Sequence, residues 1–124
     1  MVSIETHPLK NKTLDAFYEY HGETMDKKHT RYVILLDLIE GVVATPENVK
    51  GHIEFLRSLE NKGILELAGP FTDFKGGMII IKANSIDEAK AIAHTDPLVK
   101  DKIRSCEVRT WALSCEENNH LGRG

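Results

Sequence analysis

Several features that would assign a chain of 124 residues to a common class are missing from this sequence. Its two cysteines, Cys106 and Cys115, are too few for a disulfide framework, and both are interpreted as reduced thiols. No apolar run approaches the roughly 20 residues that a membrane span needs, and the N-terminus lacks the apolar core of a signal peptide. These absences indicate a cytoplasmic protein with no membrane partner.

Clusters of basic residues are also missing. The formal net charge is −3, and the longest basic run, Lys27-Lys28-His29, is short and preceded by Asp26. Nucleic-acid binding needs a concentrated basic face, so we expect no nucleic-acid partner. The sequence contains no P-loop, GxGxxG motif, nucleophile elbow or CxxC pair, and its histidines outside position 52 lack metal-ligand spacing. We therefore expect no metal and no other cofactor.

The length and composition of the chain fit one globular domain. The sequence is 41% hydrophobic and 28% charged, as is usual for such domains. Residues 1–30 form a polar N-terminal extension, in which Leu14, Phe17 and Tyr18 predict one short amphipathic helix. The pattern predicts the folded domain over residues 31–113, followed by a polar C-terminal tail over residues 114–124.

The secondary structure is legible from residue 31 onward. Thr45 before Pro46 is typical of a helix start, and Ser85 with Glu88 has the spacing of a capping box. Short runs rich in β-branched and other apolar residues predict the strands. The expected elements are strand 32–36, helix 46–62, strand 64–68, strand 78–82, helix 86–95 and strand 103–113.

This order of elements, βαββαβ, is the signature of an α+β ferredoxin-like domain with a four-stranded antiparallel sheet. Right-handed crossovers place both helices on one face of that sheet. The first strand is apolar on both faces, with Ile34 and Leu36 on one side and Val33 and Leu35 on the other. An open apolar face is a large patch for a monomer to expose, so we expect a homodimer with its two sheets packed face to face.

The expected topology brings polar and flexible residues together at one edge of the sheet. The ends of the first two strands meet the start of the first helix, the start of the third strand and the end of the second helix there. Such convergence predicts a pocket for a small molecule. The residues placed at this edge are Asp37, His52, Gly69, Pro70, Asp73, Gly76, Gly77, Asp96 and Pro97, and we expect Gly69, Pro70, Asp73 and Gly77 to contact the ligand.

His52 carries the most information among these residues. At helical periodicity it falls inside the apolar arc of the first helix, between Val49 and Ile53. A buried imidazole needs a hydrogen-bond partner, which either Asp96 or Asp37 can supply. The other ring nitrogen is then available as a base or an acid. The alternative is a core histidine bonded to a backbone carbonyl, without chemistry.

Short motifs spaced along residues 31–111 together match the pattern of one protein family. They are Tyr32-Val33-Ile34, His52 with Phe55-Leu56, Ala68-Gly69-Pro70-Phe71 with Asp73, Gly76-Gly77, Ser85 with Glu88-Ala89, Asp96-Pro97 and Val108-Arg109-Thr110-Trp111. In this order the region from Arg31 to Trp111 resembles the YCII-related family of small dimeric α+β proteins. The resemblance implies a dimeric α+β barrel and a cleft holding His52 with Asp96, Asp37 being the other candidate for the acid.

The resemblance also implies a type of chemistry. The family is similar in fold to muconolactone isomerases, and its enzymatic branch includes dehydrochlorination of a chlorinated hydroxyquinol. We therefore expect a cofactor-free enzyme in which His52 transfers a proton and Asp96 orients it, catalysing isomerisation or elimination on a small ring-shaped or carbonyl compound. Two alternatives remain: a non-catalytic module that binds or senses a small metabolite, and a dimeric structural protein in which His52 only packs.

Overall fold

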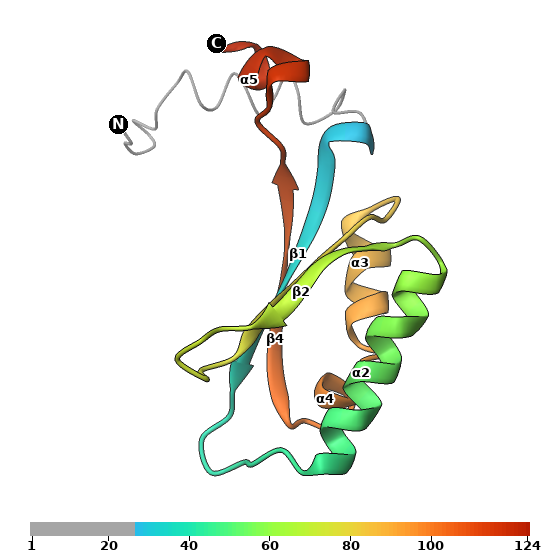
Figure 1. The fold of residues 1–124 in the computed structure, drawn as a ribbon, viewed down its shortest axis with the longest axis vertical. Helices are drawn as coiled ribbons and strands as arrows, with labels where there is room; N and C mark the ends of the chain where they lie inside the picture. Colours follow the sequence, from blue (N-terminus) through green and yellow to red (C-terminus); the bar gives the residue numbers. More distant parts are fainter. Residues whose placement is uncertain (1–26) are drawn as a thin grey trace.

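The computed structural model describes residues 27–124, and its fold is drawn in Figure 1. The short helix expected around Leu14 lies outside the described residues. No helix in the described part is long and apolar enough to cross a membrane. The elements are η1 (Lys27–His29), β1 (Thr30–Leu38), α2 (Pro46–Asn61), β2 (Leu65–Pro70), β3 (Gly77–Ile81), α3 (Ile86–Ala93), α4 (Pro97–Lys100), β4 (Arg104–Ala112), η2 (Glu116–Asn118) and α5 (Asn119–Gly122).

The strands form one four-stranded sheet in the order β2-β3-β1-β4. Every neighbouring pair is antiparallel, and β1 pairs with β4 from Thr30↔Ala112 to Leu38↔Arg104. The helices α2, α3 and α4 lie together on one side of this sheet (Figure 1). The expected α+β ferredoxin-like class is therefore confirmed.

Alternation along the strands places the core between the sheet and the helices. Tyr32, Ile34 and Leu36 of β1 are buried, whereas the residues between them are only half-buried. They pack with Ile79 and Ile81 of β3. The helices complete the core with side chains that point back to the sheet, namely Phe55, Leu59, Ala89, Ala93 and Leu98.

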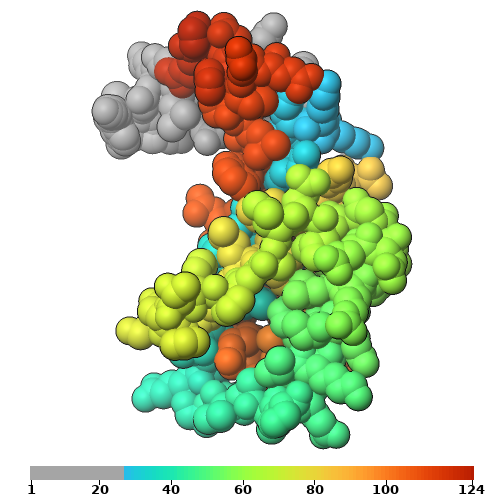
Figure 2. All heavy atoms as spheres, viewed as in Figure 1, coloured from blue at the N-terminus to red at the C-terminus, as the bar shows by residue number. Residues whose placement is uncertain are grey.

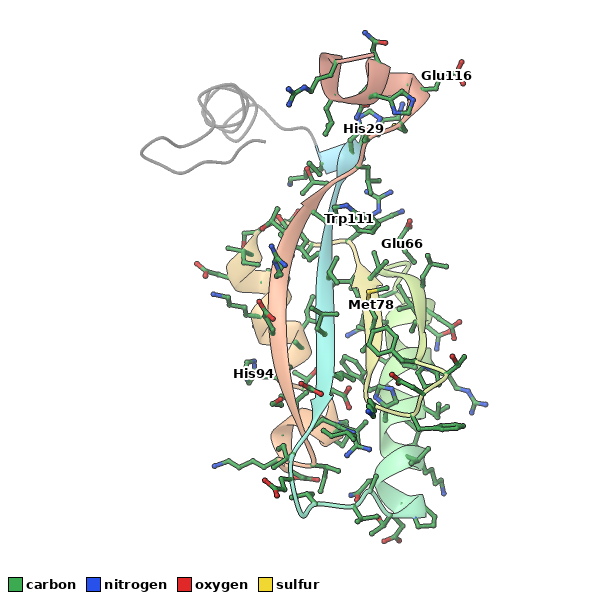
Figure 3. The ribbon with its side chains drawn as sticks, turned by 90° about the vertical axis from the view of Figure 1, so that its left-hand side faces the viewer. His29, Glu66, Met78, His94, Trp111 and Glu116 are labelled. Atoms are coloured by element: carbon green, nitrogen blue, oxygen red, sulfur yellow. The ribbon has the colours of Figure 1, made fainter. Side chains whose placement is uncertain are left out.

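The opposite face of the sheet is apolar over β1 and β3, carries the exposed Glu107 and Arg109 on β4, and is not covered by any described helix. Figure 3 looks onto this face, where Met78 and Trp111 are labelled. Ile80 is buried on it, although it does not belong to the core beneath the helices. Leu67, its partner on β2, is 67% exposed. A second apolar face of this kind is what the doubly apolar pattern of β1 and β3 predicts.

The expected boundaries move by no more than two residues, and two departures from the expected elements bear on the site. The second strand was expected to end at Ala68, but Gly69 and Pro70 also pair with β3 and belong to β2. Proline is tolerated there because β2 is an edge strand, so its missing N–H breaks no ladder. A helix after Pro97 was not expected, yet Pro97 begins α4, and Asp96 in extended geometry is its N-cap.

Gly76 allows the β2–β3 hairpin to approach β1 closely. Its φ is +94°, and a Cβ atom built on it would lie 2.1 Å from the carbonyl oxygen of Leu36. Gly41 has a similar φ of +80°, but nothing lies within 4 Å of a Cβ atom there. The two glycines therefore separate the effect of backbone conformation from that of close approach.

We expect Gly76→Ala to lower the free energy of unfolding by about 3 kcal/mol or more, because a methyl group forces the hairpin away from β1. Gly41→Ala should cost only about 1 kcal/mol, the strain of positive φ alone. Urea denaturation followed by circular dichroism measures both values. Equal losses in the two variants would contradict the close approach at Gly76.

Candidate functional site

A cavity of about 510 Å³ opens between α2, the β2–β3 hairpin and the start of β4. In Figure 2 it is the hollow between the yellow-green hairpin and the green helix, with orange atoms of the α4–β4 segment at its floor. Its walls are mainly apolar and include Leu36, Leu56, Pro70 and Leu98. This size and character are typical of sites for small molecules.

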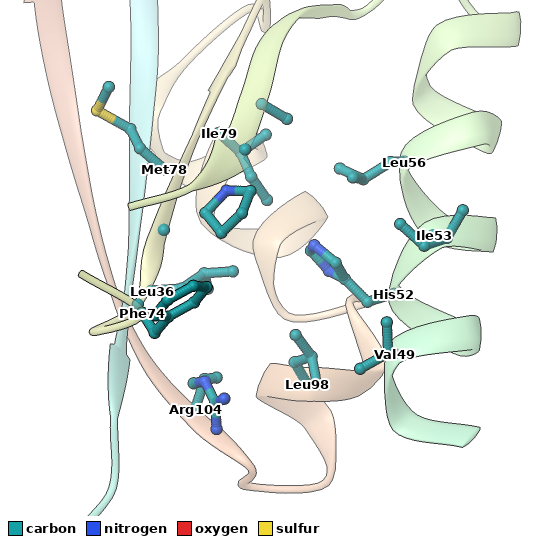
Figure 4. Close-up of a pocket in the computed structure, with 15 residues that line it drawn as sticks. Leu36, Val49, His52, Ile53, Leu56, Phe74, Met78, Ile79, Leu98 and Arg104 are labelled. Atoms are coloured by element: carbon teal, nitrogen blue, oxygen red, sulfur yellow. The ribbon is translucent and has the colours of Figure 1, made fainter. Parts of the chain in front are cut away.

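His52 lies on α2 and its ring projects into this cavity (Figure 4). Its side chain is 17% exposed. Val49 and Ile53, expected as part of a continuous apolar arc, are exposed and line the cavity, whereas Phe55 and Leu59 reach the core. The apolar side of α2 therefore has two roles: its N-terminal half forms a wall of the cavity, and its C-terminal half packs in the core.

The imidazole of His52 contacts the carboxylate of Asp96. Nδ1 of the ring lies 2.8 Å from Oδ2 of Asp96, and Asp96 is only 1% exposed. The other carboxylate oxygen, Oδ1, accepts a hydrogen bond of 3.0 Å from the backbone N–H of Leu98. Both oxygens of this buried carboxylate therefore have a partner, one in the backbone N–H of Leu98 and one in the ring of His52.

Close packing of α2 against α4 brings the two residues together. A Cβ atom built on Gly51 would lie 3.2 Å from Cγ of Pro97, so a larger residue at position 51 would press on α4. Gly51 precedes His52 and Pro97 follows Asp96 in the sequence. The contact between these neighbours sets how far the histidine lies from its acid.

This arrangement determines which ring nitrogen can react. An ionised carboxylate only accepts hydrogen bonds, so with Asp96 ionised, Nδ1 of His52 donates to it and carries the proton of the neutral ring. Nε2 then has the free lone pair. A cavity ligand that meets Nε2 can give up a proton to it, and Asp96 stabilises the cation that results.

Cys106 lies near the pair but does not line the cavity. Burial, with a smaller contribution from the negative charge of Asp96, raises the pKa of its thiol above the ordinary value. A thiol shifted in this direction is a poor nucleophile at neutral pH. The structure therefore gives Cys106 no place in the chemistry of the cavity.

The other residues expected at the site divide into two groups. Gly69, Pro70 and Gly77 line the cavity. Asp37 does not line it, and its Oδ1 accepts from the backbone N–H of Leu38 at 2.8 Å. Asp73 does not line it either, and its carboxylate closes a turn by accepting from the N–H of Lys75. Of the two candidate acids, Asp96 is therefore the one in contact with His52.

Several residues that line the cavity were not anticipated as site residues from the sequence, and Phe74 and Arg104 are the two that matter most. Phe74 lies on the β2–β3 loop with a φ of 63°, and nothing in the sequence marks its position. Arg104 is the first residue of β4 and shares its face of the strand with Cys106 and Val108, so the alternation of the strand was a usable signal. Among residues 27–124, no group of three or more His, Cys, Asp and Glu side chains is arranged to hold a metal ion.

Comparisons with known proteins agree with this fold. The model of the YCII-related domain matches residues 30–112. The uncharacterized protein YjpA of Bacillus subtilis (strain 168) is 42% identical over 67 residues, which are 54% of this chain and 79% of YjpA. A similar solved structure is 5-chloro-2-hydroxyhydroquinone dehydrochlorinase (TftG) from Burkholderia phenoliruptrix AC1100, in complex with 2,5-dihydroxybenzoquinone. It has a TM-score of 0.58 and 23% identity, over 72% of this chain and 99% of TftG.

We expect Asp96→Ala to lower the free energy of unfolding by about 2–4 kcal/mol, because it leaves the N–H of Leu98 and Nδ1 of His52 without an acceptor in a buried place. Asp37→Ala is the matched control and should cost less than about 1 kcal/mol, since Asp37 is exposed. Urea titration of the three proteins checks this. Similar losses in both variants would show that the carboxylate of Asp96 is not specially engaged.

Proposed function

Because the chain belongs to the YCII-related family, we propose that it is a cofactor-free enzyme that moves a proton on a small ring-shaped or carbonyl-bearing molecule. The observation that carries this proposal is the 2.8 Å contact between His52, which lines the cavity, and the buried carboxylate of Asp96. A histidine held in one tautomer by a carboxylate is a common arrangement for general acid–base catalysis.

In the proposed reaction, Nε2 of His52 removes a proton from a carbon atom next to a carbonyl group. The electron pair of the broken C–H bond forms the carbon–carbon double bond of an enolate, and the imidazolium is stabilised by Asp96. In an elimination, a leaving group on the neighbouring carbon then departs with its bonding pair. In an isomerisation, the imidazolium returns the proton to a different carbon. General-base catalysis of this kind accelerates a reaction by about 10²–10⁴-fold.

The similarity to TftG supports elimination as one form of this chemistry, since TftG is named as a dehydrochlorinase. At 23% identity the likeness concerns the fold, so the reaction proposed for this chain depends on its own His52 and Asp96. The apolar walls of the cavity suit a largely apolar ring.

We expect the full-length chain to accelerate exchange of α-C–H protons for deuterium in some members of a panel of small cyclic ketones in D₂O. His52→Ala should reduce the exchange rate of those compounds by about 10²–10⁴-fold, because the base is removed. His94→Ala is the control, since His94 is exposed and its ring bonds the backbone of Lys90. One-dimensional ¹H NMR measures the rates.

Three results would count against the proton-transfer proposal. One is unchanged exchange in His52→Ala. Another is saturable binding of the same compounds without exchange, which would favour a non-catalytic binding module. The third is a chain that neither binds nor exchanges any of them, which would favour the structural alternative.

We also propose that the protein is a homodimer joined through the open face of its sheet. This face presents Leu67 and Trp111, which are 67% and 45% exposed, beside the half-buried Val33, Leu35 and Met78 (Figure 3). Exposed apolar area of this kind is typically covered by a partner. Pairing two such faces would give the barrel expected of the family.

The charged groups at one border of this face are held within the chain. Glu66 lies 3.2 Å from Nε of Arg31 and 3.3 Å from Nζ of Lys82. Burial acts to raise the pKa of Glu66, but the hydrogen bonds and charges of Arg31 and Lys82 outweigh it and hold that pKa below the ordinary value. Glu66 is therefore a paired anion at the border, which does not oppose the approach of a second sheet.

We expect Leu67→Glu to convert the dimer to a monomer, because it places a charge in the proposed apolar contact. Val43→Glu is the matched control: Val43 is 82% exposed and lies in the loop before α2. Light scattering coupled to size-exclusion chromatography measures the mass of each protein. A monomeric unmodified chain, or a Leu67→Glu variant that stays dimeric, would contradict the proposed interface.

A further inference from the structure

The cavity has an uneven distribution of charge. Among the described residues that line it, His52 and Arg104 are the ionisable ones, and no carboxylate is exposed in its wall. Asp96 lies behind His52 rather than in the wall. Because a guanidinium is protonated at all ordinary pH values, Arg104 gives the cavity a permanent positive charge.

The position of Arg104 is unusual for a charged side chain. Along β4, Arg104, Cys106 and Val108 are half-buried on the face that the helices cover, whereas Ser105, Glu107 and Arg109 are exposed. Arginine therefore stands in a series that otherwise holds weakly polar or apolar residues. A partly desolvated cation is costly unless another group balances it.

The contacts of Arg104 leave most of its donors available. Nη1 donates one hydrogen bond of 2.9 Å to the backbone carbonyl oxygen of Ile103. Within the described residues, no carboxylate lies within ion-pair distance of its guanidinium. Figure 4 shows Arg104 and His52 on different sides of the same hollow, projecting from β4 and from α2. Both groups therefore line the space that a ligand would occupy.

We propose, as an extension of the proposed function, that the cavity selects a small, largely apolar molecule with one anionic oxygen, which Arg104 binds. The anionic oxygen is a carboxylate or a phenolate or enolate oxygen, and all of these accept paired hydrogen bonds from a guanidinium. The same contact suits the proposed reaction, since negative charge collects on the carbonyl oxygen when His52 removes a proton. The apolar walls hold the rest of the molecule.

The test uses three probes on the full-length chain: benzoate, 4-nitrophenolate and benzamide, the neutral counterpart of benzoate. Binding is followed by ¹H–¹⁵N NMR titration at a pH where both acids are ionised. In Arg104→Gln, Kd for the anions should rise about 10- to 100-fold, as expected for loss of a charged hydrogen bond, while Kd for benzamide stays the same. The control is Arg57→Gln, an exposed arginine on α2 that does not line the cavity, which should change no Kd.

Arg104→Lys keeps the charge but loses the planar fork, so it should weaken anion binding less than Arg104→Gln. It also serves if Arg104→Gln fails to fold, because a reduced preference for the anions over benzamide in a folded Arg104→Lys supports the same conclusion. An effect on benzoate alone or on 4-nitrophenolate alone supports the proposal and identifies the oxygen.

Three results would overturn the inference. The first is an equal rise in Kd for benzamide and benzoate in Arg104→Gln. The second is binding of the anions to the unmodified chain no tighter than that of benzamide, and the third is no saturable shift with either anion at millimolar concentrations. The proton-transfer proposal is judged separately, by the exchange assay with His52→Ala. If the exchange is lost in His52→Ala but the unmodified chain shows no preference for anions, only the role of Arg104 is removed. If the chain prefers anions but catalyses no exchange, only the catalytic role of His52 is removed.

Discussion

The packing of α2 against α4 is the contact on which the site depends. Gly51 and Pro97 approach so closely that a Cβ atom at position 51 would lie 3.2 Å from the proline ring. Their neighbours His52 and Asp96 are joined as a result. The carboxylate of Asp96 also caps α4 through the N–H of Leu98, so one buried acid serves both the fold and the histidine. Any change that separates these two helices affects the fold and the site together.

Most of the fold follows from local signals that do not compete with one another. The caps at Thr45 and Ser85 are both present, with the side chain of each accepting a backbone N–H three residues later. The α4 helix was missed for a physical reason. Proline disfavours helical geometry at the residue before it, which indicated a helix end at Asp96, but it also suits the first position of a new helix. Sequence alone does not say which of these effects applies.

The choice between Asp37 and Asp96 was also partly decidable from the sequence. Asp37 follows Leu36 on β1, and successive side chains on a strand point to opposite faces. Because Leu36 is buried beneath the helices, Asp37 had to point away from them. The same alternation on β4 places Arg104 with Cys106 and Val108. By contrast, no sequence pattern gives the distance between His52 and Asp96, since that depends on how two helices pack.

The β2–β3 hairpin belongs both to the cavity and to the open face of the sheet. Ala68 and Pro70 line the cavity, whereas Leu67, which precedes Ala68 on β2, is exposed on the other side. Met78 lines the cavity although it pairs with Leu35, whose side of β1 faces away from the core. A partner seated on the open face would therefore press on residues that also shape the cavity. For this reason the proposed dimer and the proposed site are not independent, and a variant that separates the two subunits also tests whether the cavity needs its outer support.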